Sequence, residues 1–212
     1  MNRKITEELI KIAQKEIKRE DISHDFGHTL RVLKLAKLIA KEENADLDII
    51  VPAALFHDII VYPKDDKRSK LSTNESAVCA GKILKKIEGF PAGKITKVQH
   101  AIQYHSFSQR NNTKILEDLI LQDADRLEAT GAIAIMRTFA SAGQMGKSFY
   151  NLKDPFCNNR KPQSMTYSLD LFYDRLLLVC NQMYTQKAKI LAKERTVFLH
   201  KFIRELKKEL AF

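Results

Sequence analysis

The chain has 212 residues, of which 44% are hydrophobic, and a formal net charge of +10. This length and composition suit one large globular domain or two small ones, and no apolar run reaches the roughly 20 residues that a membrane-spanning helix needs. The positive charge is compatible with a polyanionic partner, but the lysines are spread over many segments and often lie beside glutamates. Most of them are therefore expected on solvated helix faces.

The beginning of the chain and its cysteines indicate a cellular location. Residues 1–8 contain no apolar signal core, which predicts a cytoplasmic protein without a membrane partner. The three cysteines, Cys79, Cys157 and Cys180, show neither a disulfide framework nor the spacing of a metal site. They are expected to be reduced thiols.

Helical periodicity dominates the chain, and no convincing strand is found. A helix carrying the His57-Asp58 pair is expected to begin at a cap formed by Asp46 or Asp48, with Pro52 in its early part. The next helix, which ends at about residue 86, is expected to be capped by Ser72, Thr73 or Asn74. The remaining helices are predicted over residues 3–19, 28–43, 94–104, 114–128, 131–141, 168–184 and 187–209.

Residues 142–166 form the one long irregular stretch, and loops of this length are usually functional or mobile. The two helices after it are too few to build a core alone, so a single all-α domain is predicted over residues 1–212. An apolar stripe at helical spacing, from Phe172 to Cys180, favours core packing, and a homodimer interface is the alternative.

The most informative pair is His57-Asp58, which is flanked by large apolar residues on both sides. Burying an imidazole beside a carboxylate is costly unless something compensates them, and a bound metal ion would do so. Upstream lie His24, Asp25 and His28. His24 and His28 could share a helix face, or a cap at Ser23 or Asp25 could place His28 in the first turn.

Downstream, Asp123 and Asp125 are about 200° apart on a helix, so both cannot point at one ion. One is a candidate ligand, and the other is a candidate for holding a ligating imidazole in place. A set of imidazoles and carboxylates suits Mn²⁺, Fe²⁺, Ni²⁺, Co²⁺ or Zn²⁺, and the absence of thiolates argues against structural zinc.

Four ordered blocks of this sequence resemble a known family. They are Ser23-His24-Asp25-x-x-His28-x-x-Arg31-Val32, Ala53-Ala54-Leu55-Phe56-His57-Asp58, Asn74-Glu75-Ser76-Ala77 and Gln122-Asp123-Ala124-Asp125-Arg126-Leu127. The order H…HD…D is similar to that of the HD superfamily of metal-dependent phosphohydrolases, and the finer pattern resembles its small bacterial YedJ/YpgQ-like subgroup. The resemblance runs from about residue 20 to the C-terminus.

The resemblance implies a bundle of about eight to ten helices and a metal held by His28, His57, Asp58 and a late aspartate. For this last ligand Asp125 is preferred and Asp123 is the alternative. The expected cofactor is Mn²⁺, with Mg²⁺ and the ions named above as alternatives. The implied reaction is hydrolysis of a nucleotide phosphoanhydride by a metal-activated water, or nucleotide dephosphorylation.

Other polar residues are candidates for catalysis or substrate binding. Glu75, Asp58 and Asp123 are candidate catalytic carboxylates, although Glu75 could simply favour a helix N-terminus. The candidate substrate-binding residues are Lys64, Arg68, His105, Arg126 and His24, and most charge runs such as the one around Lys64 are solvated surface. His100 is a weaker candidate and His200 is expected to be incidental.

Other functions remain open at this point. An alarmone or cyclic-nucleotide hydrolase is one alternative, but the chain has Asn74-Glu75-Ser76 where alarmone hydrolases carry a Glu-Asp pair, and it lacks a Gly-Tyr-Pro block. A basic nucleic-acid-binding module is another, and it would bind with a steep salt dependence. No groove-reading motif supports it, so the expected partner is a small phosphorylated molecule.

Overall fold

The computed structural model describes residues 1–17, 25–62, 66–106 and 113–211. Within these residues the protein has nine α-helices and no strand, apart from one isolated bridge between Ser148 and Tyr167. The prediction of an all-α bundle is thereby confirmed. None of the described helices is both long and apolar enough to cross a membrane.

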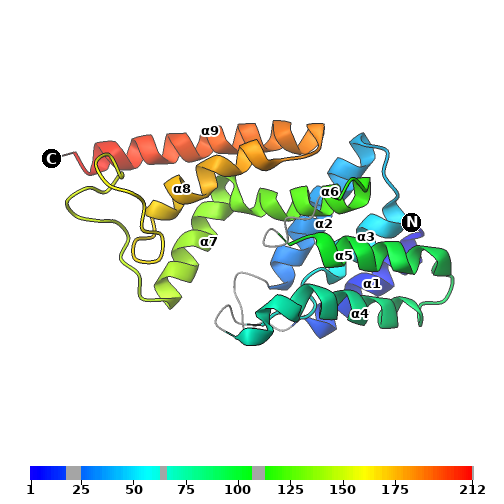
Figure 1. The fold of residues 1–212 in the computed structure, drawn as a ribbon. Helices are drawn as coiled ribbons and strands as arrows, with labels where there is room; N and C mark the ends of the chain where they lie inside the picture. Colours follow the sequence, from blue (N-terminus) through cyan, green and yellow to red (C-terminus); the bar gives the residue numbers. More distant parts are fainter. Residues whose placement is uncertain (18–24, 63–65, 107–112, 212) are drawn as a thin grey trace. The chain divides into compact units, whose positions relative to one another are not determined.

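The internal contacts divide the chain into two compact units, Met1–Asp125 and Arg126–Phe212. Unit 1 contains helices α1 to α6, and unit 2 contains α7 to α9 (Figure 1). The single domain over residues 1–212 remains a prediction.

Helix α3 (Leu47–Phe56) is the centre of unit 1, because every residue from Ile49 to Phe56 is buried. Asp46 caps it by accepting a hydrogen bond from the backbone N–H of Asp48, as the sequence predicted. Pro52 lies in the middle of this helix and not in its early part. The other helices of unit 1 are α1 (Arg3–Glu16), α2 (Phe26–Glu42), α4 (Ser72–Leu84), α5 (Ile95–Tyr104) and α6 (Leu116–Arg126).

The helices α1, α2, α4 and α5 all contact α3, and α4 packs along α5 (Figure 1). The α4–α5 approach is close at Gly81, where an added Cβ would lie 2.5 Å from the side-chain nitrogen of Gln99. Gln99 donates a hydrogen bond from that nitrogen to the carbonyl of Ala77. Glycine therefore lets the two helices that flank α3 come together.

Unit 2 is built from α7 (Gly131–Gln144), α8 (Asp170–Asp174) and α9 (Gln186–Glu209) around one core. The buried residues of this core are Ala134, Leu169, Phe172, Leu176, Leu199 and Ile203. Phe172 therefore packs in the core, as its apolar stripe predicted. The homodimer alternative remains a prediction.

Three predictions about the elements were wrong. The expected helix over residues 168–184 is interrupted at Arg175, whose φ of −142° is not helical, and continues as a 3₁₀-helix over Leu176–Gln182. No side chain caps α4, because a 3₁₀-helix over Lys67–Leu71 runs directly into it. The irregular stretch begins after Gln144 and not at residue 142, because α7 is longer than expected.

Candidate metal centre

His28 enters the site from the first turn of α2. Asp25 is the N-cap of this helix and accepts a hydrogen bond of 2.7 Å from the backbone N–H of His28. This is the arrangement in which the cap places His28 in the first turn, one of the two that the sequence left open. The imidazole of His28 is completely buried.

His57 and Asp58 follow the end of α3, because the helix closes at Phe56 and His57 is its C-cap. The sequence placed both residues on the helix itself, so this detail was wrong. The ring of His57 donates from Nδ1 to the carbonyl oxygen of Ala54 at 2.9 Å. The last carbonyls of a helix lack helical partners, so His57 satisfies one of them and turns Nε2 away from the helix.

His105 repeats this arrangement at the end of α5. It is the C-cap of that helix, and its Nδ1 donates to the carbonyl oxygen of Ile102 at 2.6 Å. Its Nε2 lies 3.4 Å from one carboxylate oxygen of Asp58. The sequence placed His105 at a helix end but assigned it to the substrate.

The Nε2 atoms of His28 and His57 are 3.2 Å apart. His28 Nε2 lies 3.6 Å from Asp125 and 3.8 Å from Asp58, and His57 Nε2 lies 3.4 Å from Asp58. Two overlapping groups of side chains thus have ligand atoms within 4.8 Å of one another: His28, His57 and Asp125, and His57, Asp58 and His105. Five side chains from four different segments of unit 1 therefore converge.

The protonation states of His57 and Asp125 favour a bound cation. Burial lowers the pKa of His57 to about 4, so its Nε2 carries a free lone pair at neutral pH. Burial opposes the charge of Asp125, but the nearby His28 and His57 outweigh this effect and lower the pKa of Asp125. Burial also opposes charge on His105, but its hydrogen bond with Asp58 raises the pKa of His105 overall. Neutral imidazoles and ionised carboxylates are the forms that bind divalent metals.

Asp123 and Asp125, the two aspartates of α6 that were candidate ligands, have different surroundings. Asp125 belongs to the convergent group, whereas Asp123 is completely buried in α6 and belongs to neither of the two groups found among the described residues. Asp123 as the alternative ligand or as a catalytic carboxylate remains a prediction.

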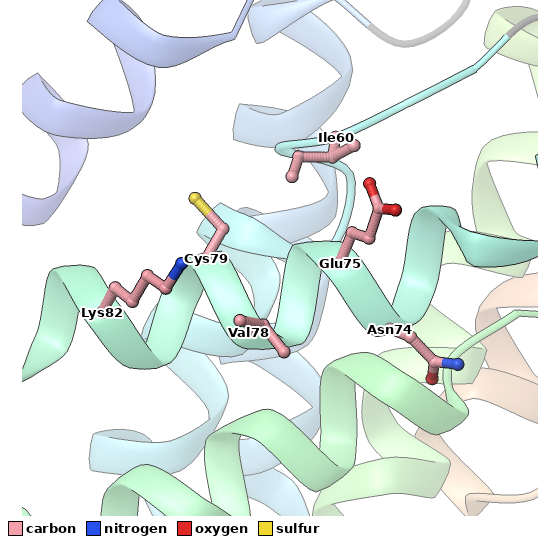
Figure 2. A pocket seen from close by; sticks show the side chains of 6 residues that line it. All are labelled: Ile60, Asn74, Glu75, Val78, Cys79 and Lys82. Carbon is pink, nitrogen blue, oxygen red and sulfur yellow. The ribbon is translucent and has the colours of Figure 1, made fainter. Parts of the chain in front are cut away.

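Glu75 stands in the first turn of α4 and accepts a hydrogen bond of 2.7 Å from the hydroxyl of Tyr62. The next residue, Ser76, bonds through its hydroxyl to both the N–H and the carbonyl of Ile60. The start of α4 is thereby attached to the segment that directly follows Asp58. Figure 2 shows Glu75 and Ile60 in an open pocket of about 390 Å³, whose other lining residues are Asn74, Val78, Cys79 and Lys82.

Tyr62 is a residue of this region that the sequence reasoning missed. Its ring lies under the guanidinium of Arg68, which is 4.5 Å from the ring centroid. Arg68 itself is paired with Asp66 at 2.7 Å on the surface. A tyrosine in a charged segment carries little signal in a single sequence, because only its contacts with Glu75 and Arg68 distinguish it.

The remaining candidates do not join the cluster in the described residues. Arg126 donates to the carbonyl of Gln182 and lies over the ring of Tyr184, both within unit 2. His100 pairs with the buried Asp118 at 2.9 Å. His24 and Lys64 lie outside the described residues.

Comparison with known proteins agrees with this geometry. The HD domain matches residues 25–130, which include all five convergent side chains. The chain belongs to the HD domain family, as its sequence motifs predicted.

Within that family it is a close relative of YpgQ. The uncharacterized protein YpgQ of Bacillus subtilis is 34% identical over 197 residues, which cover 90% of this chain and 86% of YpgQ. The crystal structure of YpgQ in complex with ADP has a TM-score of 0.73 at 31% identity and covers 97% of this chain and 98% of YpgQ. An HD-superfamily hydrolase of Bacillus thuringiensis has a TM-score of 0.72 at 28% identity, with 97% and 96% of the two chains covered.

Proposed function

We propose that the protein is a metal-dependent phosphohydrolase that hydrolyses a phosphoanhydride bond of nucleoside or deoxynucleoside triphosphates. The observation that carries this proposal is the convergence of His28, His57, Asp58, His105 and Asp125 in unit 1. Membership of the HD family supports it, and so does the ADP bound in the crystal structure of YpgQ.

The donor set fits a divalent ion. His28, His57, Asp58 and Asp125 would hold it, since imidazole and carboxylate groups suit Mn²⁺, Fe²⁺, Ni²⁺, Co²⁺ or Zn²⁺, and Mn²⁺ is the expected ion. A metal in such a site lowers the pKa of a bound water and neutralises phosphoryl oxygens. Two ordered hydrogen bonds, to the carbonyls of Ala54 and Ile102, keep the rings of His57 and His105 aimed at the site.

The protein's other groups supply binding and proton transfer. His105 can hold a proton at Nε2 beside Asp58 and pass it to a leaving oxygen. Glu75, oriented by Tyr62, is the candidate carboxylate for positioning water. Arg68, Lys64, Arg126 and His24 remain proposals for phosphate contacts, and Arg68 would have to leave Asp66 to make one.

A turnover assay with several nucleoside triphosphates and Mn²⁺ tests the proposal. His57→Ala and Asp58→Ala should each lower kcat/KM by at least about a thousandfold, because losing the metal removes several kcal/mol of transition-state stabilisation. His200→Ala is the control, since that histidine is exposed on α9. Activity that survives both site variants would contradict the proposal.

The products distinguish the two phosphatase chemistries. Release of pyrophosphate and a nucleoside monophosphate from a triphosphate identifies the pyrophosphohydrolase, whereas release of inorganic phosphate and a nucleoside from a nucleoside monophosphate identifies a phosphomonoesterase. Metal analysis of Asp125→Asn and Asp123→Asn separates the two aspartates. Asp125→Asn should lose bound Mn²⁺, whereas Asp123→Asn should retain most of it.

A further inference from the structure

Unit 2 carries most of the net positive charge of the protein. Its 87 residues include 15 lysines and arginines against 7 aspartates and glutamates, a formal charge of +8, whereas unit 1 has 21 against 19, a charge of +2. An asymmetry of this size between two parts of one chain indicates a polyanionic partner for the basic part.

The segment from Met145 to Leu169, which joins α7 to α8, exposes large apolar side chains. Leu152 is 88% exposed, Met165 81%, Phe149 65% and Met145 59%. Single exposed apolar residues are ordinary, but four on one connecting segment, all more than half exposed, are a feature that needs a partner.

This segment is held in shape by its own polar contacts. Arg160 makes a two-pronged pair with the buried carboxylate of Asp170, and its Nε donates to the carbonyl of Asp154. The carboxylate of Asp154 in turn accepts hydrogen bonds from the backbone N–H groups of Asn158 and Asn159. The segment is therefore an ordered structure that presents its exposed side chains in a fixed arrangement.

The two arms of the segment lie side by side. Ser148 bridges to Tyr167, and the backbone N–H of Leu169 donates to the carbonyl of Phe149 at 2.8 Å. Lys147 donates to the carbonyl of Ser164 at 3.0 Å. Each of the four exposed apolar residues is within two positions of one of these residues or of Asn151, which donates to the Tyr167 hydroxyl. All four therefore lie on one ordered segment, and together they are called the patch.

Lysines lie on the same segment as this patch and on the end of α9 that contacts it. Lys153 and Lys161 are exposed on the segment itself, and no described carboxylate pairs with either. The end of α9 lies against the segment, because the ammonium group of Lys207 is 5.1 Å from the ring centroid of Phe156 (Figure 1). Asp174 is an exposed acidic group of this region, and it accepts a hydrogen bond from Ser164. The carboxylate of Asp170 is paired with Arg160, whereas the carboxylate of Asp154 is hydrogen-bonded to backbone N–H groups of its own segment.

We infer that this patch, Met145, Phe149, Leu152 and Met165 with the lysines 147, 153, 161 and 207, binds the surface of an anionic lipid bilayer. Aliphatic side chains gain from insertion among acyl chains, and lysines beside them gain from anionic headgroups. A nucleic acid would use the lysines but would leave Leu152 and the two methionines in water. Surface binding needs no spanning helix, and this inference departs from the sequence-based expectation of no membrane partner.

Co-sedimentation of the full chain with vesicles tests this inference. The protein should bind vesicles of phosphatidylcholine with about one-third phosphatidylglycerol, and binding should weaken sharply when salt rises from about 0.1 M to about 1 M. Pure phosphatidylcholine vesicles should bind it at least about tenfold more weakly. Equal binding to both vesicle types, or no binding to the anionic ones, would overturn the inference.

Variants locate the binding surface. Lys153→Glu with Lys161→Glu, and separately Phe149→Ser with Leu152→Ser, should each weaken binding by about tenfold or more. The matched controls are Lys4→Glu with Lys11→Glu on α1, and Val197→Ser on the exposed face of α9. Equal weakening in the controls would contradict the patch. The inference would also be contradicted if sedimentation equilibrium showed a dimer that is dissociated only by the double variant Phe149→Ser with Leu152→Ser. The patch would then join two copies of this chain.

Discussion

The two units bury charged groups in opposite ways. In unit 2 the carboxylate of Asp170 is fully covered, and it is neutralised by the guanidinium of Arg160 and by the backbone N–H of Gln163. In unit 1 the carboxylates of Asp58 and Asp125 face imidazoles, and His57 among them is neutral at physiological pH. A buried carboxylate that is paired with a cationic side chain contributes to the folded structure. A buried carboxylate that lies beside neutral imidazoles can still bind an external cation.

The largest effect should come from breaking the fixed pair. Asp170→Asn leaves the Arg160 guanidinium partly buried without its counter-charge, which should cost about 3–5 kcal/mol of unfolding free energy. Chemical denaturation measures this loss. The control is Glu205→Gln, which removes the exposed pair with Lys208 and should change the unfolding free energy little. Equal effects of the two substitutions would show that the buried pair does not stabilise unit 2.

The next effect concerns His57 and pH. The pKa of His57 is about 4 in the folded protein and 6.5 in the unfolded chain, so below pH 6.5 the unfolded chain takes up a proton more readily. The contribution of neutral His57 to the unfolding free energy is therefore fully present above pH 6.5. That contribution is lost as the pH falls towards 4, by about 3 kcal/mol in total. The raised pKa of His105 changes the unfolding free energy with pH in the opposite direction. Metal-free wild type is therefore compared with metal-free His57→Gln, since both proteins contain His105. The stability difference between them should therefore depend on pH in this window, and a constant difference would refute the assignment.

A similar effect should come from the metal. At a free Mn²⁺ concentration about a hundred times its Kd, the unfolding free energy should rise by about 2.7 kcal/mol. Thermal melting with Mn²⁺ and with a chelator measures the change. His57→Ala should abolish it, whereas Asp170→Asn should leave it intact because that pair lies in unit 2. If the stabilisation by Mn²⁺ were lost in Asp170→Asn but kept in His57→Ala, the metal would bind in unit 2 and not at the cluster of unit 1.

The smallest effect should come from Tyr62→Phe. This change removes the hydroxyl that donates to Glu75 and keeps the ring under Arg68. If Glu75 positions water, kcat should fall by less than about tenfold with KM nearly unchanged. Arg68→Lys is the companion variant, and it should raise KM if that guanidinium contacts phosphate. A Tyr62→Phe enzyme with unchanged kcat would remove Glu75's partner from the proposed mechanism.

Much of unit 1 could be predicted from the sequence because its signals are local. The cap residue Asp25 and the apolar periodicity after it place His28, and Asp46 marks the start of α3 in the same way. Four of the convergent residues, His28, His57, Asp58 and Asp125, were expected together from their order along the chain and from the family resemblance, whereas His105 was assigned to the substrate. Asp125 lies 3.6 Å from His28 Nε2, and the choice of Asp125 over Asp123 as the last ligand remains a prediction.

The parts that could not be predicted depend on contacts between distant residues or on backbone groups. Nothing in the sequence shows that Arg160 pairs with Asp170, although this pair orders the segment that was expected to be an irregular loop. The break at Arg175 was also hidden, because the apolar spacing of the following residues is compatible with an α-helix and with a 3₁₀-helix. The partner of Glu75 was missed because Tyr62 lies on a separate segment.

Two helix ends of unit 1 act as orienting devices for imidazole rings. His57 and His105 each occupy a C-cap and each donate to the carbonyl three residues earlier. Any substitution that lengthened α3 or α5 by one turn would engage that carbonyl in the helical ladder and release the ring. Attempts to make this protein more heat-resistant by helix extension should therefore avoid these two termini, where added rigidity of the main chain would disorder the rings of His57 and His105.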